Sequence, residues 1–553
     1  MVTIIHHSVH NRFEVLASFT VRYNVHVNYL YEFSHNVKPL VPYCQPGKTQ
    51  AMTDTPFRLF NSLTRQLEEF RPVHPGEARV YSCGPTVYNY PHIGNMRAYI
   101  FADVLGRVLR WKGYDLTHII NITDVGHLTD DADKGDDKLE RMAAKQQRSI
   151  WDIARYYTEA FKADVRALNI REPAEWTVAT DYVPQMIDFA KGIADKHCYE
   201  IDSGLYFDVT TVPDYGRLAR ARTEEGEGRI EEVAGKRNAA DFAIWRRTLP
   251  GETRQMEWDS PWGRGAPGWH LECSVMSGAV LGFPFDIHTG GIDHREIHHP
   301  NEIAQNQAHC GSLGGGCADS GVRIWMHNNF LVDRTGKMSK SSGEFLTLRT
   351  LVDRGYHPLA YRLMCLQAHY RSELEFTWEG LHAALVRLRR MVGLAEVIQA
   401  NAPSFAKWTS DFLLNPKHSY ASLLEHVSEA PFTRHKAQFM QAINEDLNMP
   451  DALVSVEGTL RNNAISYPDR YIAVTSYDAI LGLDLLNLTR ADLRIRPKDA
   501  QLTEGEVETM LARRKEARAA KDFATSDAIR GELATKGVEV MDGDPLGWEW
   551  RLI

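Results

Sequence analysis

The order of hydrophobic and polar positions between residues 78 and 122 predicts a strand, a helix and a second strand. Residues 78–82, Ala-Arg-Val-Tyr-Ser, lead into a Gly-Pro-rich loop, and we interpret them as a buried strand. Residues 116–122 are interpreted as the next strand. Between them, apolar residues recur at helical spacing and stop at Gly113: Ile100, Val104, Leu105, Val108 and Leu109. Two buried strands joined by a helix form a parallel, right-handed crossover, so we expect an α/β fold.

The pattern changes after about residue 350, where helical periodicity dominates. Residues 382–396 carry Leu385, Leu388 and Val392 with arginines between them, and Val507 with Leu511 marks a further, basic helix. Alternating apolar residues after Gly537 predict a terminal hairpin. The segment at about 160–250 shows no single periodicity, and we interpret it as an inserted subdomain. These changes of pattern predict five segments of the chain: 1–51, 52–350 (which includes the insertion), 351–375, 376–495 and 496–553.

Composition bounds the class of protein. The chain has 553 residues, a formal net charge of −9 and 43% hydrophobic residues, which is ordinary for a globular protein of several domains. The acidic balance argues against a protein that coats polyanions, but it leaves room for a local basic face that binds one nucleic acid. No apolar run reaches the ~18 residues of a membrane span. Seven cysteines without a C-x-x-C pair suit a reducing compartment, so we expect a cytoplasmic protein.

Residues 1–51 differ from the rest of the chain. They contain five histidines and few charges, and they lack the features of a signal or transit peptide. We interpret them as a disordered extension or as the product of a mis-chosen start, with Met52 as the functional beginning. A His-rich metal-binding arm is the alternative.

Two short segments have the residues for phosphate chemistry. The first is Pro91-His92-Ile93-Gly94-Asn95, at the start of the predicted helix, where free backbone N–H groups favour phosphate oxygens. The second is Lys337-Met338-Ser339-Lys340-Ser341, in a Gly/Ser-flanked loop, whose two ammonium groups suit a departing pyrophosphate. Either segment alone is weak evidence, since a loop histidine or a Lys-Ser-Lys loop is usually solvated surface.

A third group of residues suits a metal. Cys83 ends the first strand, Cys273 lies farther on, and His298 and Glu302, four residues apart, are expected on one side of a helix that Pro300 begins. Two thiolates, an imidazole and a carboxylate suit zinc. Spacing alone does not establish such a site, because a single cysteine is more often a buried apolar thiol. His299 competes with His298 as the ligand.

Taken together and in this order, the two phosphate segments resemble the paired ATP-binding signatures of class I aminoacyl-tRNA synthetases. The segments 81–88, 268–273 and 298–302, with 121–125, further resemble the zinc-bearing and pocket motifs of the cysteinyl-tRNA synthetase family. The resemblance runs from about Phe60 to the C-terminus. It implies a Rossmann-like class I catalytic domain with an inserted connective subdomain at about 160–250, followed by a stem-contact linker at 351–375, a helical tRNA-binding bundle at 376–495 and a small C-terminal α+β domain.

The same resemblance implies roles for individual residues. His92, Asn95, Lys337 and Lys340 would be catalytic, within an ATP site formed by residues 91–95 and 337–341. The amino-acid pocket would contain Thr123, Trp269 and Asp293. One zinc ion would be held by Cys83, Cys273, His298 and Glu302.

The implied activity is the ligation of L-cysteine to tRNA(Cys), by a monomer, with ATP and Mg²⁺. Zinc would select the substrate thiol, because thiolate is a far better zinc ligand than the hydroxyl of serine. The chain departs from the family pattern at Asn95, Ile292 and Pro300, which puts local contacts in doubt. The alternatives are a mycothiol-type cysteine ligase, which lacks the long C-terminal region, and a non-catalytic tRNA-binding paralogue. The roles of Cys310 and Cys317, taken as bystanders, and of the anticodon-reading residues stay open.

Overall fold

The computed structural model describes most of the chain after residue 55. The described residues are 56–125, 138–219, 233–252, 254–312, 319–333, 336–337, 346–415, 418–427 and 430–552. They all belong to one compact unit, Tyr43–Ile553. The expected extension at 1–51 lies outside them. Among the described residues, no helix is long and apolar enough to cross a bilayer.

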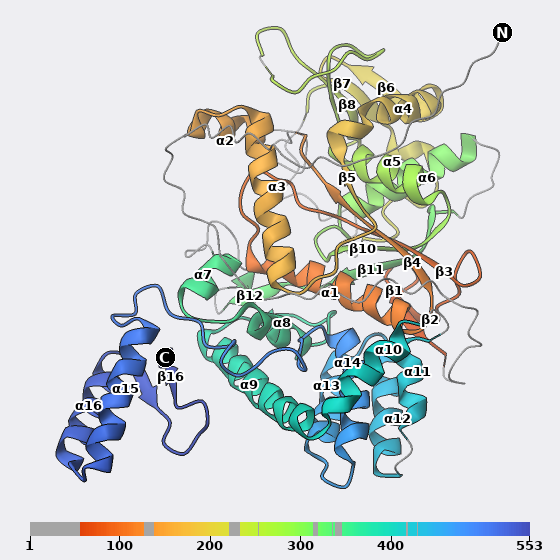
Figure 1. The fold of residues 1–553 in the computed structure, drawn as a ribbon. Coiled ribbons are helices and arrows are strands. Elements are labelled where there is room, and N and C mark those ends of the chain that lie inside the picture. Colours follow the sequence, from red (N-terminus) through yellow and green to blue (C-terminus); the bar gives the residue numbers. More distant parts are fainter. Residues whose placement is uncertain are drawn as a thin grey trace, which may run out of the picture. The chain divides into compact units, whose positions relative to one another are not determined.

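A five-stranded parallel sheet forms the centre of the first half (Figure 1). Its strand order is β11-β10-β3-β4-β5, and every neighbouring pair is parallel. The strands are β3 (Glu77–Ser82), β4 (Asp115–Ile122), β5 (Glu175–Val178), β10 (Phe285–Gly291) and β11 (Val322–Asn328). The predicted strands at 78–82 and 116–122 are therefore confirmed, and the α/β class with them.

Helices cover both faces of this sheet, because alternate residues of each strand point to opposite sides. Val80 and Ile120 pack in one hydrophobic cluster with α1 (Ile93–Trp111) and α3 (Ile150–Ala167). Tyr81 and Ile119 pack in another with α4, α5 and α6. The helices on this second side are α4 (Val183–His197), α5 (Trp269–Leu281) and α6 (His298–Ser312). Helix α1 ends just before Gly113, whose φ of 90° favours glycine, as the sequence predicts.

The sheet order places the site. The chain builds β3, β4 and β5 outward on one side and β10 and β11 on the other, so the direction reverses between β3 and β10. In open α/β sheets, ligands bind at such a switch point, outside the carboxyl ends of the strands. Cys83 follows β3, and Asp293 follows β10, at this edge.

The inserted subdomain is a separate antiparallel sheet of order β6-β7-β8-β9. It consists of η1 (Ala179–Tyr182), α4, β6 (Cys198–Ile201), β7 (Gly204–Phe207), η2 (Val209–Thr211), β8 (Phe242–Arg247) and β9 (Gly265–Pro267). Helix α3 and strand β5 pack with the main sheet, and the antiparallel sheet follows them in the chain.

Short elements surround the main sheet. They are the hairpin β1 (Arg58–Asn61) and β2 (Gln66–Glu69), helix α2 (Lys138–Gln146), and a small sheet of β12 (Leu331–Asp333), β13 (Gly336–Lys337) and β14 (Leu374–Glu375). Helices α7 (Leu348–Asp353) and α8 (Pro358–Leu366) lead into the helical region.

The rest of the described chain is helical up to a terminal hairpin. The bundle consists of α9 (Trp378–Asn401), α10 (Pro403–Leu413), α11 (Tyr420–Leu423), η3 (Leu424–His426), α12 (Ala430–Asn444), α13 (Met449–Arg461) and α14 (Tyr467–Leu481). It is followed by α15 (Glu504–Ala519), α16 (Phe523–Thr535), β15 (Val538–Val540) and β16 (Trp548–Trp550). The last two strands pair antiparallel, which confirms the predicted hairpin.

A buried charge network joins α1 to the helical region. Asp103 accepts hydrogen bonds from Arg107 Nε at 2.7 Å and from Arg362 Nη2 at 2.6 Å. Arg107 donates to the carbonyl of Ala479, and Arg362 to that of Leu481, both in α14. The two guanidinium groups therefore satisfy the carbonyls at the end of α14, and Asp103 supplies their counter-charge.

Candidate active site

A pocket of about 480 Å³ opens at the switch point of the sheet. It brings together residues from the β3–α1 loop, β4, the start of α5, the loop after β10 and the region before β12. Of the predicted site residues, the pocket is lined by Cys83, Pro91, His92, Gly94, Asn95, Thr123, Trp269, Cys273, Asp293 and His298. Ile93 and Glu302 are fully buried beside it.

The first signature segment caps α1. His92 Nδ1 accepts a hydrogen bond from the Gly94 N–H at 3.0 Å, and Asn95 Oδ1 accepts one from the His92 N–H at 3.1 Å. An Nδ1 that accepts a hydrogen bond leaves the proton of a neutral imidazole on Nε2. Both side chains are thus fixed at the helix N-terminus, where the dipole favours an anion.

The second signature segment is only partly described. Lys337 lies in β13, which pairs with β12 so that Val332 faces Lys337. The neighbouring Leu331 lines the pocket, which places this strand beside the site. The side chain of Lys337, and Met338, Ser339, Lys340 and Ser341 entirely, lie outside the described residues.

The four predicted metal ligands lie together. One ligand atom each from Cys83, Cys273, His298 and Glu302 falls within 4.8 Å of all the others. His298 Nε2 is 3.4 Å from Cys273 Sγ and 3.0 Å from Glu302 Oε1. The side chains of both His298 and Glu302 are buried. Atoms that carry lone pairs converge here, which is what a soft divalent cation requires.

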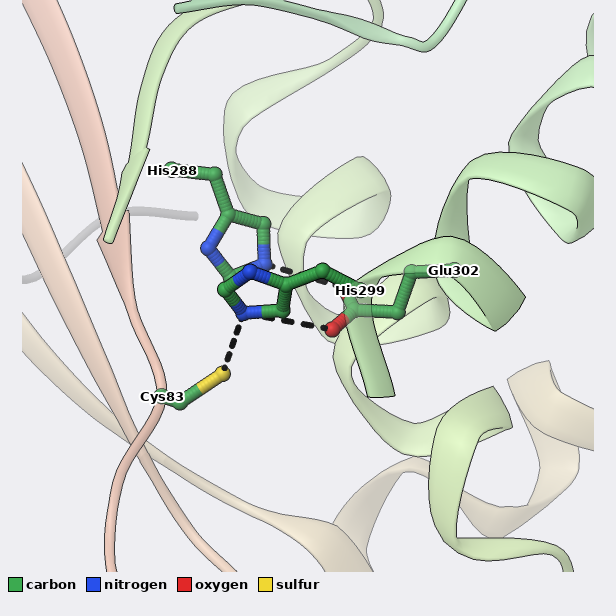
Figure 2. A group of neighbouring side chains, drawn as sticks. All are labelled: Cys83, His288, His299 and Glu302. Carbon is green, nitrogen blue, oxygen red and sulfur yellow. Dashed lines mark hydrogen bonds and ion pairs between the residues drawn. The ribbon is translucent and has the colours of Figure 1, made fainter. Parts of the chain in front are cut away.

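A second set of donors overlaps the first and retains the competing histidine. One ligand atom each from Cys83, His288, His299 and Glu302 also lies within 4.8 Å of the others. Figure 2 shows these four side chains grouped together. His299 Nε2 is 3.3 Å from Cys83 Sγ and 3.8 Å from Glu302 Oε1, and His288 Nε2 is 2.9 Å from Glu302 Oε2. Both sets need Cys83 and Glu302, and only the first contains two thiols.

Further histidines orient the candidate ligands. His298 Nδ1 is 2.9 Å from His270 Nδ1, and His299 Nδ1 is 2.8 Å from His327 Nε2. In each case one ring nitrogen meets another histidine while the second faces the ligand atoms. Hydrogen bonds of this kind fix the ring orientation and tautomer of metal-binding histidines.

The electrostatics favour a positive charge at this point. Burial raises the pKa of Glu302, but His288 and His298 outweigh it and lower that pKa to about 2. Burial lowers the pKa of His298, but Glu302 and Cys273 outweigh it and raise that pKa to about 10. The hydrogen bond with Cys83 lowers the pKa of the Cys273 thiol to about 7. The residues present therefore fit zinc, which would compete with a proton for the same lone pairs.

A chain of hydrogen bonds holds the predicted pocket residue Thr123. Gly84 N–H donates to Asn121 Oδ1 at 2.7 Å, Asn121 Nδ2 donates to Thr123 Oγ1 at 3.0 Å, and Thr123 Oγ1 donates to Glu272 Oε2 at 3.0 Å. A Cβ on Gly84 would lie 1.5 Å from the Asn121 carbonyl oxygen, so only glycine permits this approach of the β3–α1 loop to β4.

Comparison with known proteins decides the family. Residues 69–386 match the model of the tRNA synthetases class I (C) catalytic domain, and residues 501–551 match the cysteinyl-tRNA ligase anticodon binding domain. The chain belongs to the cysteinyl-tRNA synthetase family. Within this family it is 68% identical to a cysteine–tRNA ligase of Novosphingobium aromaticivorans over 90% of this chain and 97% of the relative. It is 53% identical to that of Zymomonas mobilis over 91% and 99%, respectively.

Sequence reasoning missed several residues of this cysteinyl-tRNA synthetase pocket. His294 lines it, and burial lowers its pKa to about 4. Glu272 beneath Thr123 is fully buried, and burial raises its pKa to about 8. The signal for Glu272 was its position next to Cys273, whereas nothing in the sequence distinguishes His294 from its neighbours.

Cys310 is buried in α6 and disulfide-bonded, and the other described cysteines are free. It belongs to neither donor set described above.

Proposed function

We propose that this pocket activates L-cysteine with ATP and that the protein transfers the cysteinyl group to tRNA(Cys). The observation that carries this proposal is membership of the cysteinyl-tRNA synthetase family over nearly the whole chain, with both the catalytic and the anticodon-binding parts. The match at residues 501–551 disfavours a mycothiol-type ligase, in which this region is absent.

The reaction has two steps. A carboxylate oxygen of cysteine attacks the α-phosphorus of ATP, the bond to the β-phosphate breaks, and pyrophosphate leaves. The 2′-hydroxyl of the terminal adenosine of the tRNA then attacks the carbonyl carbon of the adenylate and displaces AMP. Mg²⁺ accompanies the phosphates, and no side chain forms a covalent intermediate.

The residues act by binding and orientation. His92 and Asn95, fixed at the N-terminus of α1, orient the triphosphate, and Lys337 and Lys340 stabilise the charge that develops on pyrophosphate. Thr123, Trp269 and Asp293 line the amino-acid pocket. Cys83, Cys273, His298 and Glu302 would hold one zinc ion. When bound, zinc supplies a coordination position that the substrate sulfur fills far better than the hydroxyl of serine. We further propose a cytoplasmic monomer.

The test is a pair of assays on the purified protein. We expect cysteine-dependent exchange of labelled pyrophosphate into ATP, and cysteine-dependent charging of tRNA(Cys). Exchange without charging of tRNA, accompanied by acylation of glucosaminyl-inositol, would replace the proposal by the amino-sugar ligase. Absence of exchange would leave a non-catalytic paralogue.

Replacing His92 by asparagine tests the role of the first signature. Asparagine is a good N-cap and retains the acceptor for the Gly94 N–H, but it lacks the imidazole Nε2–H. We therefore expect kcat for pyrophosphate exchange to fall about 100-fold with little change in thermal stability. His74→Asn, on the exposed loop before β3, is the control and is expected to leave kcat unchanged. An unchanged kcat in His92→Asn contradicts the assigned role.

A further inference from the structure

Three tyrosines form an exposed aromatic cluster at the mouth of the pocket. Tyr90, from the β3–α1 loop, packs edge-on against Tyr156 and Tyr157 of α3, with ring centroids 6.1 Å and 5.2 Å away. The hydroxyls of Tyr90 and Tyr156 are hydrogen-bonded to each other. Tyr157 is buried, but Tyr90 and Tyr156 are 38% and 37% exposed. Two aromatic side chains are thus held in fixed positions at the surface.

This cluster continues the pocket. Tyr90 and Tyr157 line the pocket, together with Phe161 one turn farther along α3. Tyr156 does not line it and extends the aromatic surface outward. A molecule that enters the pocket from this side passes over Tyr156 and Tyr90 first.

Basic residues lie next to this aromatic cluster in the chain, and one of them contacts it. The guanidinium carbon of Arg148 lies 5.6 Å from the centre of the Tyr156 ring. Arg141 and Lys145 lie in α2, Arg148 follows the end of this helix by two residues, and all three side chains are exposed. Glu140, also in α2, accepts hydrogen bonds from the backbone and the side chain of Gln255. Three exposed cations therefore lie in the described segment that leads to Tyr156, on a chain of net charge −9.

Exposed aromatic and basic residues side by side suit single-stranded nucleic acid. Bases stack on aromatic rings, and phosphates contact the cations. The proposed reaction brings such a strand to this pocket, because the unpaired 3′ end of a tRNA must deliver its terminal adenosine to the adenylate.

We propose that Tyr156 and Tyr90 stack the unpaired bases just before the terminal adenosine of the tRNA, and that Arg141, Lys145 and Arg148 contact the phosphates of this segment. This inference rests on the proposed function and names a surface for its second step. The surface acts in tRNA binding and transfer, and cysteine activation does not need it.

The test compares Tyr156→Ala with Tyr156→Phe. Tyr156 is chosen because it lies outside the pocket lining. Alanine removes the stacking face, so kcat/KM for tRNA charging is expected to fall about five- to 100-fold, whereas phenylalanine keeps the face and stays within about twofold of the wild type. Arg166→Ala, an exposed change in the last turn of the same helix, is the control.

Two further measurements separate the explanations. Cysteine-dependent pyrophosphate exchange is expected to be unchanged in Tyr156→Ala; a loss there would mean that the substitution damages the pocket, and it would overturn the inference. A tRNA shortened by its three 3′ nucleotides is expected to bind wild type and Tyr156→Ala equally, whereas full-length tRNA binds the variant more weakly. Equal binding of full-length tRNA to both proteins would also overturn it. If the wild type lacks exchange altogether, the proposed function itself has failed.

Salt dependence tests the basic residues. The double variant Lys145→Ala, Arg148→Ala is expected to reduce the slope of log K for tRNA binding against log salt by about 1.4, since each phosphate contact to a single strand contributes about 0.7. An unchanged slope would show that these side chains do not contact phosphates.

Discussion

Replacing Cys83 by serine is expected to abolish zinc binding and to remove the preference for cysteine over serine. Cys83 belongs to both candidate donor sets, so its loss affects either of them. We expect the zinc content to fall from about one ion per chain to near zero, and cysteine-dependent pyrophosphate exchange to fall more than 100-fold, because loss of an outer-shell partner alone costs about 10- to 100-fold. Any remaining discrimination would be at most about 100-fold, as in pockets that separate isosteres by size.

The measurement is metal analysis together with exchange kinetics for cysteine and for serine. Cys198→Ser is the control, since Cys198 begins β6 in the insertion and belongs to neither donor set. Full zinc content in Cys83→Ser would exclude both sets as the zinc site. Comparison of Cys273→Ser with His299→Gln then distinguishes the two donor sets. If Cys273→Ser loses zinc and His299→Gln retains it, the zinc ligands are the set with two thiols, Cys83, Cys273, His298 and Glu302.

Replacing Asp103 by asparagine is expected to destabilise the protein by about 3–5 kcal/mol, as does the removal of one partner from other buried ion pairs. Asp103, Arg107 and Arg362 are all at least 95% buried. Asparagine has nearly the same shape, but it removes the carboxylate that is hydrogen-bonded to both buried guanidinium groups. Because these groups hold the end of α14, we expect the midpoint of denaturant-induced unfolding to fall and the helical region to loosen from α1.

The control is Asp188→Asn, which removes an exposed pair with Lys191 at 3.0 Å. Exposed pairs contribute at most about 1 kcal/mol, so the midpoint is expected to change little. An equal fall of the unfolding midpoint in both variants would show that the buried ion pairs of Asp103 stabilise the fold no more than an exposed pair does.

The pH dependence follows from the same network. Burial raises the pKa of Asp103, but Arg107 and Arg362 outweigh it and lower that pKa to about 2. A carboxyl whose pKa is depressed on folding stabilises the protein above its ordinary pKa of 3.8, and this stabilisation is lost as the pH falls toward about 2. The difference between wild type and Asp103→Asn is therefore expected to be constant from about pH 5 to 8 and to shrink only in acid.

The sequence alone predicted the elements whose signals are local. The strand at 78–82, the helix that stops at Gly113 and the terminal hairpin all depend on the spacing of apolar residues within a few turns, and the structure confirms them. The pairing of strands could not be predicted in the same way. Which sheet a strand such as β5 joins depends on pairing with β4, which is more than 50 residues away, and not on its own four residues.

The sequence by itself identified the family, because the residue types of the signature segments and their order along the chain resemble those of cysteinyl-tRNA synthetases. Only the tertiary structure decided which donors share a point in space. Cys83 and His299 are more than 200 positions apart, yet the parallel pairing of β3 with β10 brings the thiol to 3.3 Å from the imidazole. The second donor set, the Asp103 network and the tyrosines at the pocket mouth arise in the same way, from contacts between elements that no spacing along the chain encodes.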